Sequence, residues 1–453
     1  MDLIKSINPY TENTLKTHTV HSRTEVESIL QKSSKRFLQY KNSSFEERKI
    51  LMLNTAKELL KNKRLYAEMI TNEMGKPITQ AIAEIEKCAW VCEYYAENAE
   101  KHLSVKKIKT DAKKSYVKYE PLGVLLAIMP WNYPFWQVFR FTVPALMAGN
   151  VVVLKHASNV FGSALLIQEV FEKAGFPIHC FTTLKVGSDR VEEIIDNDII
   201  KAVTITGSGP AGSSVAATAG KNIKKSVLEL GGNNAMIVFN DASINDAIET
   251  IIQARFQNTG QSCIAGKRLL IEESIASSFI EKLSLKVSKL KSGDPIDKET
   301  FIGVMAKQNL AEKLEAQLNN SLDLGAKIEV GGKRSKTFFE PTIVSNVTPE
   351  MEIFKEETFG PLLAVTTFKN EEEAIKLSNK SKFGLGVMLF SKDIKKMEKM
   401  VPQFEEGAVF INELVKSDPR LPFGGVKTSG YGRELSSDGI KEFVNVKTVY
   451  INM

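Results

Sequence analysis

The sequence predicts an α/β protein whose core is a parallel β-sheet flanked by helices. From residue 123 onwards, short apolar runs alternate with segments of helical periodicity. Strands that are apolar throughout are buried on both faces, and a helix between two of them is typical of a right-handed parallel crossover. The expected strands are residues 123–129, 150–154, 201–206, 226–230 and 235–239, and the helices between them include residues 137–147 and 160–174.

The first hundred residues are expected to be helical. Residues 47–63 place apolar side chains at helical spacing, and residues 79–100 continue the same pattern. Met74-Gly75-Lys76-Pro77 supplies the break between these two helices, because glycine and proline both disfavour a continuous helix. Residues 1–104 and 120–231 are therefore assigned to one domain.

A second α/β series follows the Gly231-Gly232 pair, which we take as the domain boundary. Strands are expected at residues 268–271, 362–368, 387–390 and 408–411, and helices at residues 275–290 and 371–379. Residues 232–415 are assigned to this second domain. Residues 105–119 and 440–453 fit neither domain, and half-buried strands far from a core are unstable alone. We expect them to pair with each other or with another subunit.

Composition and charge exclude several classes of protein. The chain has 453 residues and a formal net charge of only +6, spread along the sequence, which argues against nucleic-acid binding. Four cysteines are too few for a disulfide framework, and no CxxC or HExxH motif suggests a metal site. The apolar stretches fall short of the roughly 20 residues that span a bilayer, and no signal-peptide pattern opens the chain. We expect a cytoplasmic protein.

A glycine-rich turn follows the expected strand 201–206. Gly207, Gly209 and Gly212 match the GxGxxG spacing, and a helical stretch follows at residues 213–219. Free N–H groups at such a helix start bind phosphate, and Ser208 lies within the turn. A tight strand-to-helix turn without a ligand uses the same glycines, so both interpretations stay open at this point.

Cys263 is the candidate nucleophile. It stands between Gly260-Gln261-Ser262 and the small residues that follow, where we expect an exposed, activated thiol. The alternative is a buried structural cysteine, which is our interpretation of Cys88, Cys92 and Cys180.

Two further polar residues end expected strands. Glu229 precedes the two glycines 231 and 232, and burial of a carboxylate raises its pKa, which suits a general base. Asn132 lies between two prolines, where a rigid amide can donate to a developing oxyanion. The alternative for Glu229 is a salt-bridged glutamate at a strand end, and the alternative for the segment of Asn132 is an ordinary turn.

Together these segments resemble the aldehyde dehydrogenase superfamily over nearly the whole chain, and most of all its short bacterial succinate-semialdehyde dehydrogenases dependent on NAD(P). The motifs that carry the resemblance are PWNYP at 130–134, Lys155, TGS at 206–208, ELGG at 229–232, GQSC at 260–263, EETFGP at 356–361 and PFGGVKTSG at 422–430.

The resemblance implies a fold and a mechanism. Residues 1–104 and 120–231 would form a modified Rossmann cofactor-binding domain, residues 232–415 the catalytic domain, and residues 105–119 and 440–453 a small β oligomerisation arm. The Cys263 thiolate would attack the aldehyde, Asn132 would hold the oxyanion, hydride would pass to the nicotinamide, and Glu229 would activate water to hydrolyse the thioester.

The resemblance also implies a cofactor, NAD or NADP, with NAD placed first. Some NAD-preferring relatives carry a glutamate where this chain has Ser158, so nothing here repels the 2′-phosphate of NADP. The residues expected to bind the cofactor are Trp131, Lys155, Ser158, Gly207, Ser208, Gly212, Glu357 and Phe359.

The substrate pocket is the least specified part of the resemblance. Arg140 matches a position that binds the distal carboxylate in some succinate-semialdehyde dehydrogenases, and structural ion pairing is its alternative. Gln257 replaces a second arginine, and Ser417, Arg420 or Lys416 could compensate. Succinate semialdehyde is the expected substrate, with glutarate semialdehyde or another short aldehyde as the alternative.

A coenzyme-A-acylating enzyme and a non-catalytic protein are disfavoured by Glu229 and Cys263. We expect a homodimer or homotetramer.

Overall fold

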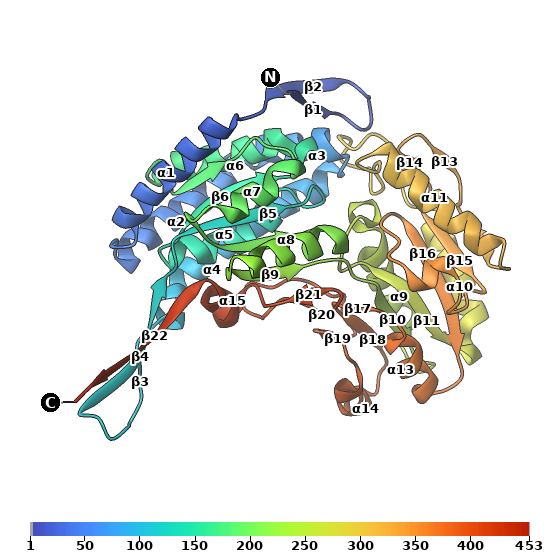
Figure 1. The fold of residues 1–453 in the computed structure, drawn as a ribbon. Coiled ribbons are helices and arrows are strands. Elements are labelled where there is room, and N and C mark those ends of the chain that lie inside the picture. Colours follow the sequence, from blue (N-terminus) through green and yellow to red (C-terminus); the bar gives the residue numbers. More distant parts are fainter. Residues whose placement is uncertain (1–2, 453) are drawn as a thin grey trace.

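The computed structural model describes residues 3–452, which form two lobes and a projecting β-arm (Figure 1). The first lobe is built on a six-stranded sheet of order β21-β9-β8-β5-β6-β7. All its neighbouring strands are parallel except the edge pair β21 and β9. Their bounds are β5 Val124–Met129, β6 Val151–His156, β7 Phe181–Thr183, β8 Ile200–Thr206, β9 Lys225–Glu229 and β21 Gly430–Tyr431.

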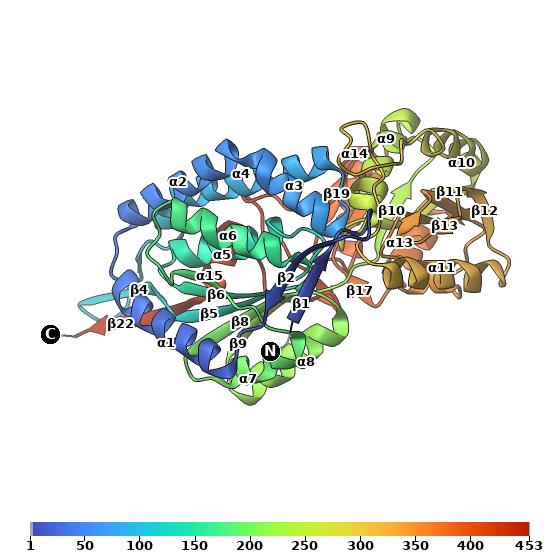
Figure 2. The same cartoon turned by 90° about the horizontal axis from the view of Figure 1, so that it is seen from above.

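Helices cover both faces of this sheet (Figure 2). On one side lie α5 (Trp136–Met147) and α6 (Phe161–Lys173), and on the other α1 (Arg23–Tyr40), α7 (Val191–Asp196) and α8 (Gly209–Lys221). β5 and β6 are buried along their whole length, as the apolar runs predicted. The expected parallel α/β arrangement of this lobe is confirmed.

Three further helices form an outer layer over α5 and α6. They are α2 (Phe45–Lys61), α3 (Lys63–Met74) and α4 (Ile78–His102), so the two predicted helices are confirmed within two residues at each end. Gly75 ends α3 in the left-handed conformation, and a Cβ there would lie 2.5 Å from Val304. The prediction of an all-helical N-terminus is wrong for β1 (Leu3–Ile7) and β2 (Thr14–Thr19), which form a hairpin.

The second lobe contains a seven-stranded sheet of order β12-β15-β16-β11-β10-β18-β19. Only the edge strand β12 is antiparallel to its neighbour. The strands are β10 Asn234–Val238, β11 Gly266–Glu272, β12 Lys327–Val330, β15 Thr342–Ser345, β16 Leu362–Phe368, β18 Val387–Phe390 and β19 Val409–Ile411.

Each face of this second sheet has its own hydrophobic core. One contains α9 (Ile244–Phe256) and α10 (Glu273–Val287), and the other α11 (Gln308–Leu322), α13 (Glu371–Asn379) and α14 (Ile394–Met400). The short elements are α12 Glu352–Lys355, β13 Arg334–Ser335, β14 Phe338–Phe339, β17 Phe383–Gly384 and β20 Val426–Lys427.

The arm is a three-stranded antiparallel sheet of β3 (Lys106–Lys107), β4 (Lys114–Pro121) and β22 (Val444–Ile451). β22 pairs with β4 from Val444 opposite Pro121 to Ile451 opposite Lys114, so the two segments pair with each other, one of the two expected arrangements. The strand begins later than expected, because residues 440–442 still belong to α15 (Ser436–Glu442). α15 packs against α4 and α5, so the chain returns to the first lobe after residue 415.

Residues 3–452 contain neither a membrane-spanning helix nor a cluster of metal-ligating side chains. No helix there is long and apolar enough to cross a membrane. Nor does any cluster of three or more histidine, cysteine, aspartate or glutamate side chains within that range offer a metal site.

Candidate active site

A cavity of about 730 Å³ lies where the carboxyl ends of β5, β8 and β9 meet the second lobe. This edge of a parallel sheet is where open α/β folds bind ligands. The cavity brings together residues that the sequence analysis selected from distant motifs. Those that line it are Trp131, Asn132, Gly207, Ser208, Cys263, Glu357 and Phe359.

The glycine turn lines one side of this cavity. Gly207, Ser208 and Gly209 line it, and Ser208 is the N-cap of the 13-residue helix α8. A helix start facing a cavity fits the pyrophosphate of a dinucleotide, because its free N–H groups and its dipole attract anions. Gly212 differs from expectation, because it does not line the cavity. A Cβ at Gly212 would lie 2.5 Å from Leu230, so this glycine lets α8 pack closely on the segment after β9.

The opposite part of the cavity is shaped by Glu357 and two aromatic rings. Trp131 and Phe359 meet edge to face at 5.7 Å between ring centroids. Glu357 accepts a hydrogen bond of 3.1 Å from the backbone N–H of Gly232. A Cβ at Gly231 would lie 2.6 Å from the Glu357 carboxylate, so the first glycine of ELGG makes room for this side chain. A fixed carboxylate beside aromatic surface fits a nicotinamide ribose and ring.

The loop that carries Cys263 has an unusual backbone. Asn258, Thr259 and Gly260 follow one another in the left-handed conformation, at φ of 56°, 53° and 70°. The left-handed conformation costs free energy for residues other than glycine, and here two of them adopt it in succession. Backbone strain of this kind concentrates at functional sites. The Asn258 side chain offsets part of that cost by donating to the carbonyl oxygens of Asn132 at 2.8 Å and of Gln261 at 3.1 Å.

Asn132 is held by the same loop. Its buried Nδ2 donates a hydrogen bond of 3.1 Å to the carbonyl oxygen of Gln261. An amide nitrogen carries two hydrogens, so the second remains for a ligand. Asn258 and Gln261 therefore fix an amide donor in the cavity that also contains Cys263.

The Cys263 thiol is half-buried rather than exposed. Burial raises its pKa to about 11, against the lowering effects of Arg140 and Lys267. The expectation of an exposed and already activated thiol is therefore wrong. The other three cysteines are fully buried, as expected of structural residues.

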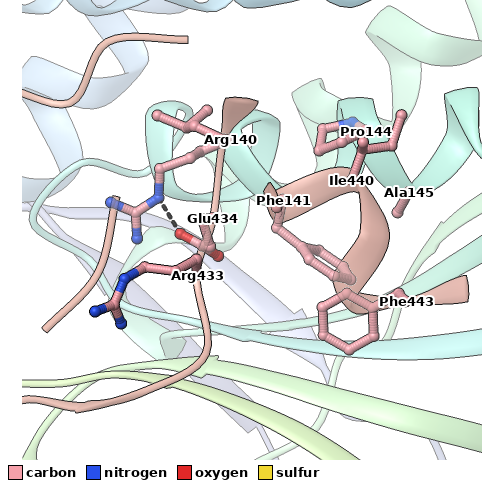
Figure 3. A pocket seen from close by; sticks show the side chains of 10 residues that line it. Arg140, Phe141, Pro144, Ala145, Arg433, Glu434, Ile440 and Phe443 are labelled. Carbon is pink, nitrogen blue, oxygen red and sulfur yellow. Dashed lines mark ion pairs between the residues drawn. The ribbon is translucent and has the colours of Figure 1, made fainter. Parts of the chain in front are cut away.

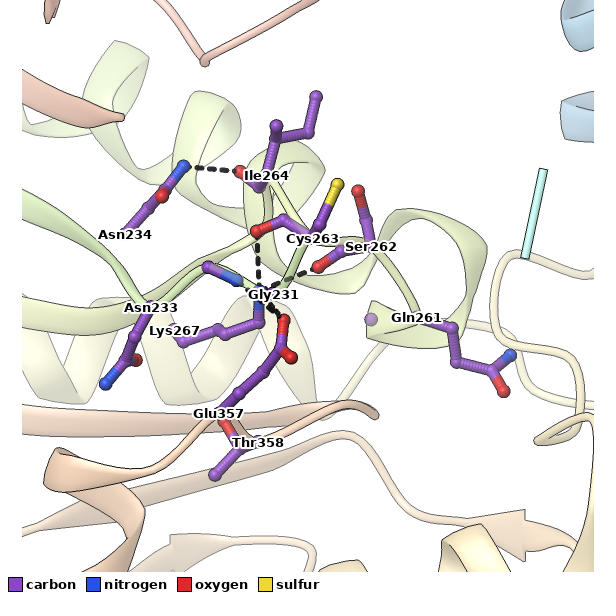
Figure 4. A network of polar contacts seen from close by, with 12 residues as sticks. Gly231, Asn233, Asn234, Gln261, Ser262, Cys263, Ile264, Lys267, Glu357 and Thr358 are labelled. Carbon is purple, nitrogen blue, oxygen red and sulfur yellow. Dashed lines mark hydrogen bonds and ion pairs between the residues drawn. The ribbon is translucent and has the colours of Figure 1, made fainter. Parts of the chain in front are cut away.

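Lys267 lies buried beneath the cysteine loop (Figure 4). Its ammonium donates hydrogen bonds of 2.8 Å to the carbonyl oxygens of Ser262 and Cys263, and forms an ion pair of 3.1 Å with Glu357. Burial lowers the pKa of Lys267, and Glu357 raises it. One cation thus connects the nucleophile loop with the carboxylate expected to hold the cofactor ribose.

Glu229 ends β9 and is 2% exposed. Burial raises the pKa of its carboxyl group well above the usual range, and the Oε1 atom has no hydrogen-bond partner among the described residues. Its charge also contributes to the raised pKa of Cys263, so the two groups are within electrostatic reach. Glu229 does not line the cavity itself; its side chain points towards Gly424.

Arg140 differs from its expected role. Its guanidinium is buried in an ion pair with Glu434 (Figure 3). It also donates to Thr206 Oγ1 at 3.2 Å and lies over the ring of Phe423. It does not line the large cavity. Because Glu434 already neutralises it, the structural ion pair left open in the sequence analysis is the arrangement that this structure has.

The remaining predicted residues are spread over β6 and the turn after it, the end of α9 and the loop after β19. Lys155 is buried on β6 and Ser158 begins a short 3-10 turn after it, while Gln257 is half-buried at the end of α9. Ser417 lies in the loop between β19 and β20, where its Oγ accepts hydrogen bonds from Lys87 and Trp136. None of these four residues lines the large cavity.

Sequence reasoning missed three residues of this region. Asn258 and Lys267 lie on either side of Cys263 in the sequence. Their roles depend on their hydrogen-bond partners, which the sequence does not reveal. Lys87 lies on the helix α4, which the sequence analysis interpreted only as packing. In the sequence, Lys87 stands between Glu86 and Cys88, which gives no signal of a role in the site.

Comparison with known proteins agrees with this geometry. The profile of the aldehyde dehydrogenase family matches residues 2–449. The chain is 45% identical to a probable succinate-semialdehyde dehydrogenase [NADP(+)] of Synechocystis and 43% identical to succinate-semialdehyde dehydrogenase [NADP(+)] 1 of Mycobacterium bovis, each over 99% of both chains.

A solved structure shows the same fold. Succinic semialdehyde dehydrogenase of Streptococcus pyogenes, crystallised with NADP+, superposes with a TM-score of 0.97 at 34% identity, covering 99% of this chain and 100% of that one. Sequence, fold and the Cys263 cavity agree. The chain therefore belongs to the aldehyde dehydrogenase family and is a nicotinamide-dependent oxidoreductase that acts on aldehydes.

Proposed function

We propose that this protein oxidises succinate semialdehyde to succinate with NADP as the preferred cofactor. The observation that carries the proposal is the single cavity in which the Cys263 thiol and the Asn132 amide lie beside the α8 helix start and Glu357. The names of the Synechocystis, Mycobacterium and Streptococcus relatives support the aldehyde and the cofactor.

The first step is attack by Cys263 Sγ on the aldehyde carbon. The thiol must lose its proton, and the positive charges of Arg140 and Lys267 lower the pKa that burial has raised. The carbonyl oxygen becomes an oxyanion, which accepts hydrogen bonds from the Asn132 amide and the Cys263 backbone N–H. One such donor contributes about 3–4 kcal/mol to transition-state stabilisation.

The thiohemiacetal then collapses to a thioester. Glu357, held by Lys267 and Gly232, would hold the ribose of a nicotinamide cofactor, whose ring would supply the hydride acceptor when bound. Glu229 takes a proton from water, which attacks the thioester carbon and releases the acid and the Cys263 thiol. The raised pKa of Glu229 fits a general base, because a stronger base accepts that proton more readily.

The surroundings of Lys155 support NADP, although the sequence alone placed NAD first. Burial lowers the pKa of Lys155, and the nearby positive charge of Lys307 lowers it further, while Asp189 raises it. Ser158 adds no negative charge. Lys155 and Lys307 together with Asp189 give the surroundings of Lys155 a net positive charge. A positive charge there favours the additional phosphate of NADP.

A second subunit is part of the proposal. The β-arm exposes apolar side chains, with Val446 58% and Tyr450 51% exposed. An extended sheet with such residues suits pairing with another copy, so we infer a homodimer or a homotetramer.

We also place the protein in the cytoplasm, since its four cysteines are all free, as in a reducing compartment.

An aldehyde panel run with both cofactors tests the proposal. Initial rates of absorbance gain at 340 nm would be measured for succinate semialdehyde, glutarate semialdehyde and butanal, each with NADP and with NAD. We expect the highest kcat/KM for succinate semialdehyde with NADP, and acid release without coenzyme A. Equal kcat/KM values for succinate semialdehyde and butanal would contradict the proposed substrate. A higher kcat/KM with NAD than with NADP would contradict the proposed cofactor.

A further inference from the structure

A small cluster of hydrogen-bond donors lies between α4, α5 and the loop before β20. Lys87 Nζ donates to Ser417 Oγ at 2.9 Å and lies over the indole ring of Trp136, 4.3 Å from its centroid. Trp136 Nε1 donates to the same Oγ at 3.0 Å. Ser417 belongs to the loop that follows β19, so the cluster joins this loop to α4 and α5.

The cluster has donors but lacks an acceptor. Ser417 Oγ receives two hydrogen bonds, and its own proton has no acceptor in the part of the chain that the structure describes, although the residue is only 4% exposed. Lys87 has further N–H groups, and no carboxylate among residues 3–452 lies within ion-pair distance of it. Unsatisfied buried donors are costly, so the arrangement fits an anionic ligand.

Three other cations of this region already form ion pairs. Arg140 is paired with Glu434, Arg420 with Asp418, and Lys416 with Glu413. These three are the cations that the sequence suggested for a substrate carboxylate. Of these four cations, Lys87 is the one without an ion pair among the described residues.

Arg140 links the surroundings of this cluster with those of the nucleophile. Trp136 and Arg140 lie one turn apart on α5 and therefore share a face. The charge of Arg140 lowers the pKa of both Lys87 and Cys263. The cluster shares no residue with the lining of the large cavity, so it would leave the cofactor site free.

We propose that Lys87, together with the Ser417 hydroxyl, binds the distal carboxylate of the aldehyde substrate. This inference rests on the proposed function and adds the specificity-determining residue for it. Lys87 would supply the positive charge that Gln257 does not, and Trp136 would hold both Lys87 and Ser417 in place. An ω-carboxy aldehyde would be selected over a neutral aldehyde of the same length.

A pH dependence follows from the surroundings of Lys87. Burial and the charge of Arg140 lower its pKa to about 8, while Cys88, Glu84 and Asp418 raise it. Above that pH the free enzyme loses the positive charge. The kcat/KM for an anionic aldehyde should therefore fall, relative to that for butanal, as the pH rises from 7 to 9.

Lys87→Met tests the proposal through a ratio of two aldehydes. We expect the ratio of kcat/KM for succinate semialdehyde to that for butanal to fall about 10- to 100-fold, mainly through KM, the range of a charge-assisted hydrogen bond. Lys101→Met, an exposed lysine on the same helix, is the matched control and should keep the wild-type ratio.

Lys87→Arg and the wild-type enzyme separate the possible outcomes. Lys87→Arg should restore most of the ratio and remove its decline between pH 7 and 9, because arginine stays charged. A wild-type enzyme without preference for succinate semialdehyde would overturn the proposed function itself. A wild-type preference that Lys87→Met leaves intact, or an equal loss on both aldehydes, would overturn the role of Lys87 alone.

Discussion

The buried ammonium of Lys267 donates a hydrogen bond of 2.8 Å to the carbonyl oxygen of Cys263. The same ammonium forms an ion pair with Glu357, which lines the cavity. One side chain therefore holds the backbone of the nucleophile and a carboxylate of the cofactor site. Lys267 is a positioning residue, because it contacts the Cys263 carbonyl oxygen and the Glu357 carboxylate and not the reacting Sγ atom.

Lys267→Met should slow alkylation of the thiol. Loss of a nearby positive charge raises the pKa of Cys263, so less thiolate is present at any given pH. We expect the rate of reaction with iodoacetamide at pH 8.5 to fall about 3- to 10-fold. In the wild type the logarithm of this rate should rise linearly with pH until it approaches about 11. An unchanged rate in a folded variant would contradict the electrostatic role.

Cys263→Ser should abolish nearly all aldehyde oxidation. A serine hydroxyl has a far higher pKa than a thiol, and no alternative nucleophile lines the cavity at this position. The measurement is NADPH formation at 340 nm with succinate semialdehyde. Cys92→Ala, which removes a buried cysteine of α4, is the control and should retain activity. Substantial turnover by Cys263→Ser would exclude the thioester mechanism.

Glu229→Gln should trap the acyl-enzyme. Glutamine cannot accept a proton from water, so hydride transfer would precede a blocked hydrolysis. We expect a burst of about one NADPH per active site, followed by slow turnover. A linear time course without a burst would mean that Glu229 is not the base or that hydrolysis is not limiting.

The pH profile of hydrolysis gives a second measure of Glu229. Burial raises its pKa, so the carboxyl group is still protonated at pH values where an ordinary glutamate has ionised. The rate of thioester hydrolysis in the wild type should rise with pH as this group loses its proton. Glu229→Gln should lack that rise.

Lys76→Met should destabilise the first domain. Lys76 and Glu84 form a fully buried ion pair, and Glu84 also accepts hydrogen bonds of 2.9 Å from the backbone of Phe135 and Trp136 at the start of α5. Removing one partner leaves a buried charge, at a cost of about 3–5 kcal/mol. Urea unfolding followed by circular dichroism would measure the loss. Lys76→Met/Glu84→Gln should recover part of it, because glutamine keeps the acceptor without the charge.

Much of the fold could be predicted from local pattern. The strands β5 and β6 are buried on both faces, and such strands have a distinct apolar sequence. The β1–β2 hairpin was missed because its residues are mostly exposed, so no apolar alternation marks them. The bend at Asn258 and Thr259 was equally invisible, since only its hydrogen bonds to Asn132 and Gln261 make it tolerable.

The sequence by itself determined the chemistry of this protein, because a thiol, a carboxyl group and an amide within specific motifs identify the reaction. Only the tertiary structure decided which charges are available to a substrate. From the sequence, Arg140 could bind a substrate carboxylate or form a structural ion pair, and in the fold Glu434 neutralises it. Lys87 looked structural, but it meets Ser417, 330 residues away along the chain, and not a carboxylate. The availability of a charge depends on its neighbours in space, and the fold brings those neighbours from distant segments.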